Sequence, residues 1–298
     1  MSHVEAELPL PKLPLREAIS LSYAWFFQKF TDILRISWLW IVICTVFAGL
    51  LSWIQAAWLP SLLADDQPTG ASELEQPLSR ALVDSGVDIL LAIATVSIAV
   101  AWHRRIILDE RPRLSGANLL TRPTWRYLGI LILFGLVTAI PVLTMLIVVS
   151  PTSTAVLPAA VIMLVWYVVA IAVFLRLSPL LPACAIGDQT VTFRETWRRT
   201  QGNVLRLFGG LLACVLPMTI LVQIVMAVVM TALWSPNSAL ANAAEIPLGV
   251  GLTLMAAGTF AGYLLTIPIG VGFLSHCYRH FFLSLIHISE PTRLRRSS

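Results

Sequence analysis

Six long apolar segments, which contain a single charged residue, Asp88, divide this chain and constrain its fold more than any other feature. They comprise residues 36–59, 87–102, 127–149, 156–175, 207–234 and 246–275. An α-helix needs roughly 20 apolar residues to cross the ~30 Å hydrocarbon core of a bilayer. The segments therefore predict an all-α, polytopic membrane protein with six transmembrane helices. The second is the shortest, but six crossings agree best with the distribution of charge.

The composition supports a membrane domain. Charged residues make up 12% of the chain, hydrophobic residues 57%, and the mean hydropathy is +0.82, whereas soluble domains carry about 25% charged residues. Four cysteines stand singly, without the spacing of a disulfide framework or a metal site. We expect no cofactor and no nucleic-acid partner.

The end of the chain is interpreted separately. Residues 283–293 resemble the translated product of an adapter used in preparing DNA sequencing libraries. The alternative is a native basic tail that lies on anionic lipid. We favour a non-native tail over residues 283–298, which leaves a six-helix membrane domain over 14–282 and a disordered segment over 1–13. Without the three arginines and one glutamate of that tail, the net charge falls from +4 to +2.

The basic residues predict the topology. Sixteen of the seventeen that precede residue 283 fall on one side of the six segments, and Arg80 alone falls on the other. Since cytoplasmic loops carry the excess of Lys and Arg, both termini are expected in the cytoplasm. The arginines on that side are the candidates for contact with anionic lipid or with an unidentified protein partner: Arg16, Arg35, Arg104, Arg105, Arg126, Arg176, Arg194, Arg198, Arg199, Arg206 and Arg279.

An internal repeat is also expected. Three units, over about 14–108, 109–178 and 188–282, each contain a basic amphipathic segment, an apolar segment, a loop and a second apolar segment. Arg35, Arg126 and Arg206 occupy corresponding places in them. This pattern predicts three helical hairpins accompanied by cytoplasmic amphipathic helices.

The segments before the first and fifth spans have helical periodicity. In the first, the apolar residues fall on one face: Leu15, Ile19, Tyr23, Phe26, Phe30 and Ile33. In the other, Phe193, Trp197, Val204 and Phe208 form an apolar stripe, and Thr192 and Glu195 have the spacing of a capping box. Glu195 is placed to pair with Arg198 or Arg199. Such helices either anchor and orient the spans or recognise lipid or a partner.

Candidate chemistry is sparse. His276 and His280 are four residues apart and could share a metal ion, with His103 at a similar depth. Histidines at a helix end usually have no metal, so no metal site is predicted. Asp109, Glu110 and Asp188 are expected to balance arginines rather than act as acid and base.

Three short motifs carry a family resemblance. They are Leu-Arg-Glu-Ala at 15–18, Trp-His-Arg-Arg-Ile-Ile-Leu at 102–108, and Leu-Pro-Ala-Cys-Ala-Ile-Gly-Asp at 181–188 followed by Phe-Arg-Glu-Thr-Trp at 193–197. The chain resembles uncharacterised bacterial six-span inner-membrane proteins, which are similar to the membrane domain attached to some glycerophosphodiester phosphodiesterases. The resemblance implies an architecture and a compartment, and it brings no catalytic residues.

These observations favour a non-enzymatic membrane helper or scaffold. Proline inside several apolar segments supports a second hypothesis, a transporter for a neutral or lipid-like substrate, because broken helices can line a substrate site. Those prolines are Pro141, Pro158, Pro217 and Pro268. A membrane-embedded lipid enzyme is a third hypothesis, which requires carboxylate or histidine side chains to converge at the cytoplasmic interface.

Overall fold

The computed structural model describes residues 12–63, 72–111, 121–148, 156–234 and 248–283. Within these ranges the chain is almost entirely helical and contains no strand. The connections at 150–155 and 235–245 lie outside the described residues, as does the tail from residue 284 onward. The interpretation of that tail as non-native stays a prediction.

Six of the helices contain a stretch long and apolar enough to cross a membrane. They are α2 (Phe30–Leu63), α3 (Ser72–Leu108), α4 (Arg122–Val148), α5 (Val156–Leu177), α8 (Val204–Trp234) and α10 (Leu248–Tyr278). The prediction of an all-α, polytopic membrane protein is therefore confirmed. The short second segment is explained by its surroundings, because α3 packs against α2, α4, α6 and α10 and is the most protected of the six.

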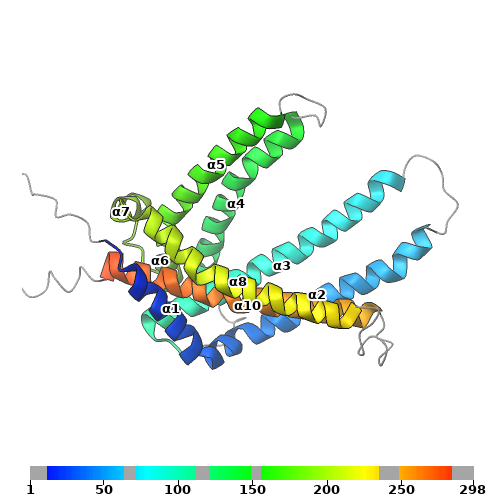
Figure 1. Ribbon diagram of the computed structural model, residues 1–298, viewed down its shortest axis with the longest axis horizontal. Coiled ribbons are helices and arrows are strands. Elements are labelled where there is room, and N and C mark those ends of the chain that lie inside the picture. The colour runs from blue at the N-terminus through cyan, green and yellow to red at the C-terminus, as the bar shows by residue number, and fades with distance from the viewer. Residues whose placement is uncertain (1–11, 64–71, 112–120, 149–155, 235–247, 284–298) are drawn as a thin grey trace, which may run out of the picture.

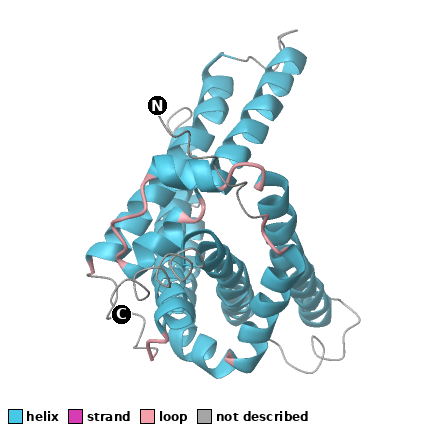
Figure 2. Ribbon diagram, turned by 90° about the vertical axis from the view of Figure 1, so that its left-hand side faces the viewer, coloured by secondary structure: helices cyan, strands magenta, loops and turns pink. Residues whose placement is uncertain are grey.

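The spanning helices form three antiparallel hairpins, α2–α3, α4–α5 and α8–α10 (Figure 1). Helix α10 is the common neighbour, since it packs against α2, α3 and α8. The α4–α5 hairpin is set apart from the other two in both views (Figures 1 and 2). Three hairpins agree with the expected repeat, but the self-similarity of the units stays a prediction.

Two glycines bring α10 close to α8. A Cβ atom at Gly258 would lie 2.8 Å from the Met226 Sδ, and one at Gly262 would lie 2.3 Å from a Val222 methyl carbon. Small residues four apart allow such an approach in membranes, where close packing replaces the hydrophobic effect as the attraction between helices. The absence of a side chain at these two positions therefore permits the tight contact between α10 and α8.

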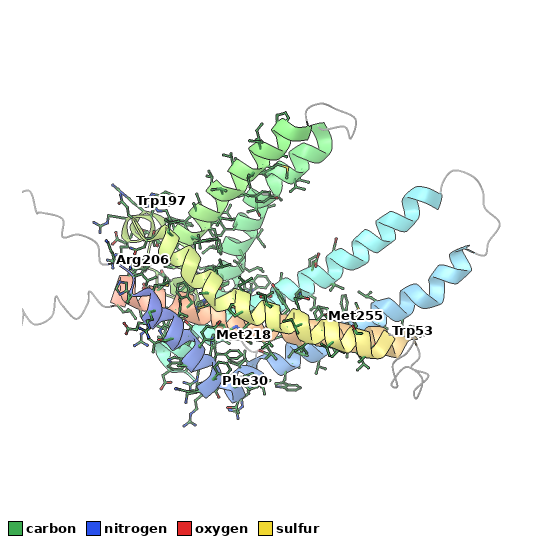
Figure 3. All side chains as sticks on the ribbon, viewed as in Figure 1. Phe30, Trp53, Trp197, Arg206, Met218 and Met255 are labelled. Atoms are coloured by element: carbon green, nitrogen blue, oxygen red, sulfur yellow. The ribbon has the colours of Figure 1, made fainter. Side chains whose placement is uncertain are left out.

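Short helices gather at one end of the hairpins. They are α1 (Leu15–Gln28), α6 (Leu180–Ile186), α7 (Phe193–Arg199) and the π-helix η2 (Arg279–Leu283). The starts of α2, α4 and α8 and the ends of α3, α5 and α10 complete this end, which we call the basic end. Trp197 and Arg206 lie there, whereas Trp53 and Met255 lie toward the far end of their hairpins (Figure 3). All eleven candidate arginines belong to the basic end.

Both amphipathic segments are shorter than their periodicity suggests. Helix α1 ends at Gln28, and Phe30 already begins α2, so Phe30 and Ile33 are part of a span. Helix α7 ends at Arg199, because the chain turns before α8 through Gly202, whose φ of 74° is readily adopted by glycine. The single stripe expected from Phe193 to Phe208 is therefore divided between two helices.

The expected disorder of the N-terminal segment does not extend to Leu13. Its side chain is fully buried, its N–H donates to the Asn203 Oδ1 at 3.0 Å, and its carbonyl accepts from the Arg206 Nη1 at 2.8 Å. These bonds fix the start of α1 to the start of α8. Residues 1–11 lie outside the described residues.

Substitution of two adjacent glycines of α8, Gly209 and Gly210, tests the packing at the basic end. A Cβ at Gly210 would lie 2.2 Å from the Phe273 Cζ and 2.8 Å from the Leu15 Cδ1, whereas one at Gly209 meets no atom within 4 Å. We expect Gly210→Ala to lower the unfolding temperature in detergent, since overpacking costs about 1–3 kcal/mol. Gly209→Ala should leave it unchanged or raise it, because alanine favours a helix over glycine by about 1 kcal/mol. Equal melting temperatures for the two variants would contradict this packing.

Candidate functional site

Two arginines at the end of α3 are bound by carboxylates. Arg104 makes a bidentate ion pair with Glu110, in which its Nη2 lies 2.6 Å from Oε1 and its Nε lies 2.9 Å from Oε2. It also donates to the carbonyl of Ala185 in α6 at 3.2 Å. Arg105 pairs with Asp32 at the start of α2, at 2.9 Å, and with Asp109. Asp109 and Glu110 therefore balance neighbouring arginines, as predicted. Arg105 also joins the two helices of the first hairpin.

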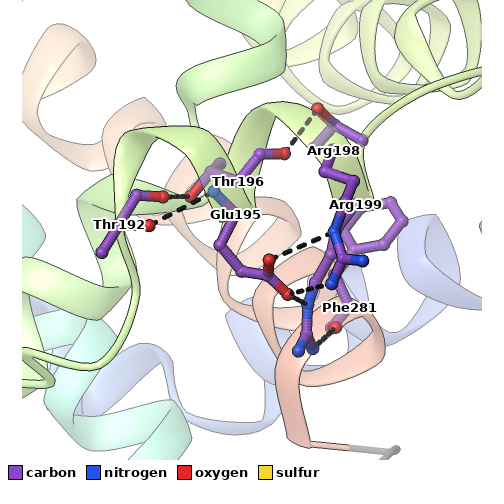
Figure 4. A network of polar contacts seen from close by, with 7 residues as sticks. Thr192, Glu195, Thr196, Arg198, Arg199 and Phe281 are labelled. Carbon is purple, nitrogen blue, oxygen red and sulfur yellow. Dashed lines mark hydrogen bonds and ion pairs between the residues drawn. The ribbon is translucent and has the colours of Figure 1, made fainter.

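The predicted network on α7 is present (Figure 4). The Thr192 Oγ1 accepts from the backbone N–H of Glu195 at 3.3 Å and caps the helix. Glu195 pairs with both Arg198 and Arg199. Arg199 continues to the carbonyl of Phe281 at 2.6 Å, so it ties α7 to η2. The hydrogen bonds from Arg198 and Arg199 lower the pKa of Glu195.

Arg176 and Arg206 hold backbone groups. Arg176 donates to the carbonyl of Trp197 at 2.8 Å, and its Cζ lies 3.7 Å from the centroid of the same indole ring. This cation–π contact fixes the end of α5 to α7. Arg206 binds the carbonyl of Leu13, as described above. Six of the eleven candidates thus bind a described partner, and all of them except Arg198 connect different elements of the basic end.

The other five candidates are different. Their side chains are exposed, and among the described residues they form no hydrogen bond or ion pair: Arg16, Arg35, Arg126, Arg194 and Arg279. They come from α1, α2, α4, α7 and η2, so all three hairpins contribute. A guanidinium group can bind a phosphate through two parallel hydrogen bonds, and these five are available for such contacts.

His103 belongs to a buried contact between the three hairpins. It is fully buried in α3, its Nδ1 lies 2.8 Å from the Oγ of Ser275 in α10, and its Nε2 lies 3.4 Å from the hydroxyl of Tyr127 in α4. Since Ser275 donates its own proton to the carbonyl of Val271 at 2.9 Å, it accepts from the Nδ1–H. The Nε2 then accepts from Tyr127, which defines the neutral tautomer.

This contact separates His103 from the other two histidines of the hypothetical metal site. Both its ring nitrogens face α4 and α10 partners, and no group of three metal-ligating side chains gathers among the described residues. The contact therefore joins helices.

Asp188, which follows α6, differs from the prediction that it balances an arginine. It accepts from the Tyr278 hydroxyl at 2.6 Å and from the Thr190 hydroxyl at 2.7 Å. Burial raises the pKa of Asp188, but these hydrogen bonds outweigh it and lower the pKa below its usual range. The sequence could not reveal this partner, because Tyr278 is ninety residues away.

A cleft of about 570 Å³ opens between α1 and the end of α10. Its polar lining consists of Glu17, His276, Arg279 and His280, and its apolar lining includes Leu13, Ala18, Leu21, Trp25 and Leu283. A second cavity, of about 450 Å³, lies on the α7 side and is lined by residues that bind one another, among them Asp188, Glu195 and Tyr278. In the first cleft, the Glu17 carboxylate and the Arg279 guanidinium form no ion pair with a described residue.

Sequence reasoning did not single out Glu17. It was visible only as part of the Leu-Arg-Glu-Ala motif at 15–18, and its neighbours in the cleft lie some 260 residues further along the chain. Comparison of the chain with family models, with curated proteins and with solved structures yields no match.

The network on α7 predicts a pH dependence. Glu195 has a folded pKa below its usual value of 4.5, so its ion pairs stabilise the protein fully above about pH 4.5, and this contribution is lost as the pH falls through the folded pKa. We expect Glu195→Gln to lower the melting temperature at pH 7, with a deficit that shrinks as the pH is lowered toward 3. Glu17→Gln, which removes a carboxylate without an ion pair to a described residue, serves as control and should melt as the wild type does at pH 7. A Glu195→Gln deficit that persists undiminished at pH 3 would contradict the role of the ion pairs.

Proposed function

We propose that this multi-pass protein resides in a bacterial inner membrane, with both termini in the cytoplasm. It acts there without catalysis, as a helper or scaffold whose basic end contacts the anionic inner leaflet. The observation that carries the proposal is a set of five exposed arginines at the basic end that form no hydrogen bond or ion pair with a described residue. They are Arg16, Arg35, Arg126, Arg194 and Arg279.

The division of the arginines supports this proposal. A guanidinium group already bound to a carboxylate or a carbonyl has fewer N–H donors left for a lipid phosphate. Arg105 and Arg199 are bound in this way. An exposed and unbound one at the surface of an anionic leaflet contributes about 1 kcal/mol of attraction. Five such groups spread over three hairpins would hold the basic end against the headgroups on several sides.

The compartment rests on two further supports. The excess of basic residues at one end agrees with the bias that orients membrane proteins toward the cytoplasm. The resemblance to six-span bacterial inner-membrane proteins points to the same compartment. The six apolar helices support only a multi-pass membrane protein. The bacterial inner membrane and the cytoplasmic orientation of the termini therefore remain predictions.

The transporter hypothesis receives no comparable support. Helices α4, α8 and α10 continue through Pro141, Pro217 and Pro268. The two cavities described above lie at the basic end, and neither reaches the middle of a span. Transport of a neutral or lipid-like substrate therefore stays the second candidate.

Replacing four of the exposed arginines tests the lipid contact. We expect the variant with Gln at Arg16, Arg35, Arg126 and Arg194 to bind short-chain phosphatidylglycerol in neutral detergent at least about tenfold more weakly, because each arginine contributes about 1 kcal/mol. Native mass spectrometry of the purified chain gives the occupancy. Arg279 is kept because it also lines the cleft between α1 and α10.

Lysine at the same four positions is the matched control, since it keeps the charge and should retain most of the binding. Arg80→Gln, in the first part of α3 at the far end, should have no effect. Unchanged phosphatidylglycerol binding by the glutamine variant would overturn the proposal. If the variant instead lost a co-purifying protein and kept its lipid, a protein partner would replace the leaflet as the ligand of these arginines.

A further inference from the structure

One carboxylate at the basic end is unlike the rest. The other described acidic side chains there all bind a partner through their carboxylate oxygens: Asp32, Asp109, Glu110, Asp188 and Glu195. The carboxylate of Glu17 makes no ion pair or hydrogen bond to another described residue, although Arg16 is its neighbour in sequence. Glu17 is exposed and lines the cleft between α1 and α10.

The opposite wall of the cleft carries the complementary groups. Arg279 is exposed and forms no ion pair with a described residue, Glu17 included. His276 is 8% exposed, and its Nε2 has no hydrogen-bond partner among the described residues. A buried polar atom without a partner costs free energy. The cleft is thus lined by a carboxylate and a guanidinium without an ion pair to a described residue, and by a histidine whose buried Nε2 has no hydrogen-bond partner among the described residues.

We propose that this cleft binds the phosphoethanolamine headgroup of phosphatidylethanolamine. The primary ammonium donates to the Glu17 carboxylate, and the phosphate accepts from the Arg279 guanidinium and from a ring N–H of His276. A ligand with both charges pairs both walls at once, which neither an anionic nor a cationic ligand can do. The cleft volume of about 570 Å³ lies within the roughly 300–1,000 Å³ of ordinary ligand pockets.

Choline and glycerol headgroups fit less well. A quaternary ammonium has no N–H to donate to Glu17 and is usually recognised by aromatic faces. The aromatic ring in the cleft is Trp25, and the Arg105 guanidinium already lies over it, 5.9 Å from the centroid. Phosphatidylglycerol has no cation to offer Glu17 in return for its desolvation.

The source of the headgroup is a membrane lipid. The stretch that begins in α10 at Thr253 and is long enough to span a membrane continues through η2 to Leu283, so the cleft lies at the end of a span. Leu21 and Trp25 supply an apolar side against which the glycerol end of the lipid can pack. This inference rests on the proposed function in placing the basic end at the headgroups, but it requires only Arg279 of the five exposed arginines.

Titration of the purified full chain in neutral detergent with dihexanoyl phosphatidylethanolamine tests the inference. We expect one bound molecule for the wild type, and weaker binding by about tenfold or more for Glu17→Gln and for Arg279→Gln, as for the loss of one charge-assisted hydrogen bond. Arg80→Gln, in the first part of α3 and far from the cleft, should bind as the wild type does. Dihexanoyl phosphatidylcholine should bind more weakly to the wild type and be insensitive to Glu17→Gln.

Glu17→Gln separates this inference from the proposed function, because it removes a negative charge and should leave phosphatidylglycerol binding unchanged or stronger. Equal binding of phosphatidylethanolamine by the wild type and both cleft variants would overturn the inference, as would no binding at any concentration. Equal binding of free phosphoethanolamine and the lipid would keep the headgroup chemistry and overturn the lipid as its source. The four-arginine variant keeps Glu17, His276 and Arg279, so its phosphatidylglycerol binding tests the proposed function and not the binding of phosphatidylethanolamine in the cleft.

Discussion

Lipid tails are as apolar as leucine, so helices in a membrane gain little from hiding apolar side chains against one another. Close packing and polar contacts must hold this protein together, and both are concentrated on α10. Gly262 admits Val222 of α8, and Ser275 accepts from His103 of α3, which in turn accepts from Tyr127 of α4. One buried imidazole therefore connects a helix from each hairpin. Beyond this junction the α4–α5 hairpin diverges from the others (Figure 1).

Much of this architecture could be predicted from local patterns. The six apolar segments, the cap at Thr192 and the ion pairs of Glu195 all depend on residues near in sequence or on the length of a span. The sequence pattern does not predict that helices end at Gln28 and Arg199, because the helical spacing of apolar residues continues across the turns that follow them. The pairing of Asp188 with Tyr278, and the cleft that unites Glu17 with Arg279, arise from packing between distant elements that no local pattern encodes.

The arginines illustrate how charge serves two purposes in this protein. Arg105, Arg176, Arg199 and Arg206 join elements by binding carboxylates, an indole ring or backbone carbonyls. Five others remain exposed at the same end, where headgroups of a leaflet would meet them. The basic residues that predict topology from sequence therefore include arginines that join elements of the basic end and arginines that remain on its surface. Only the fold distinguishes these two groups.

The account depends on all these arginines facing one side of the membrane, the cytoplasmic one. Cysteine accessibility tests this directly, because the four native cysteines are buried and free. With an impermeant maleimide applied to intact bacterial cells, we expect Gly70→Cys, between α2 and α3, to be labelled and Arg194→Cys to be protected. Inverted membrane vesicles should reverse the pattern. Labelling of Arg194→Cys in intact cells, or of both positions from the same side, would contradict the account.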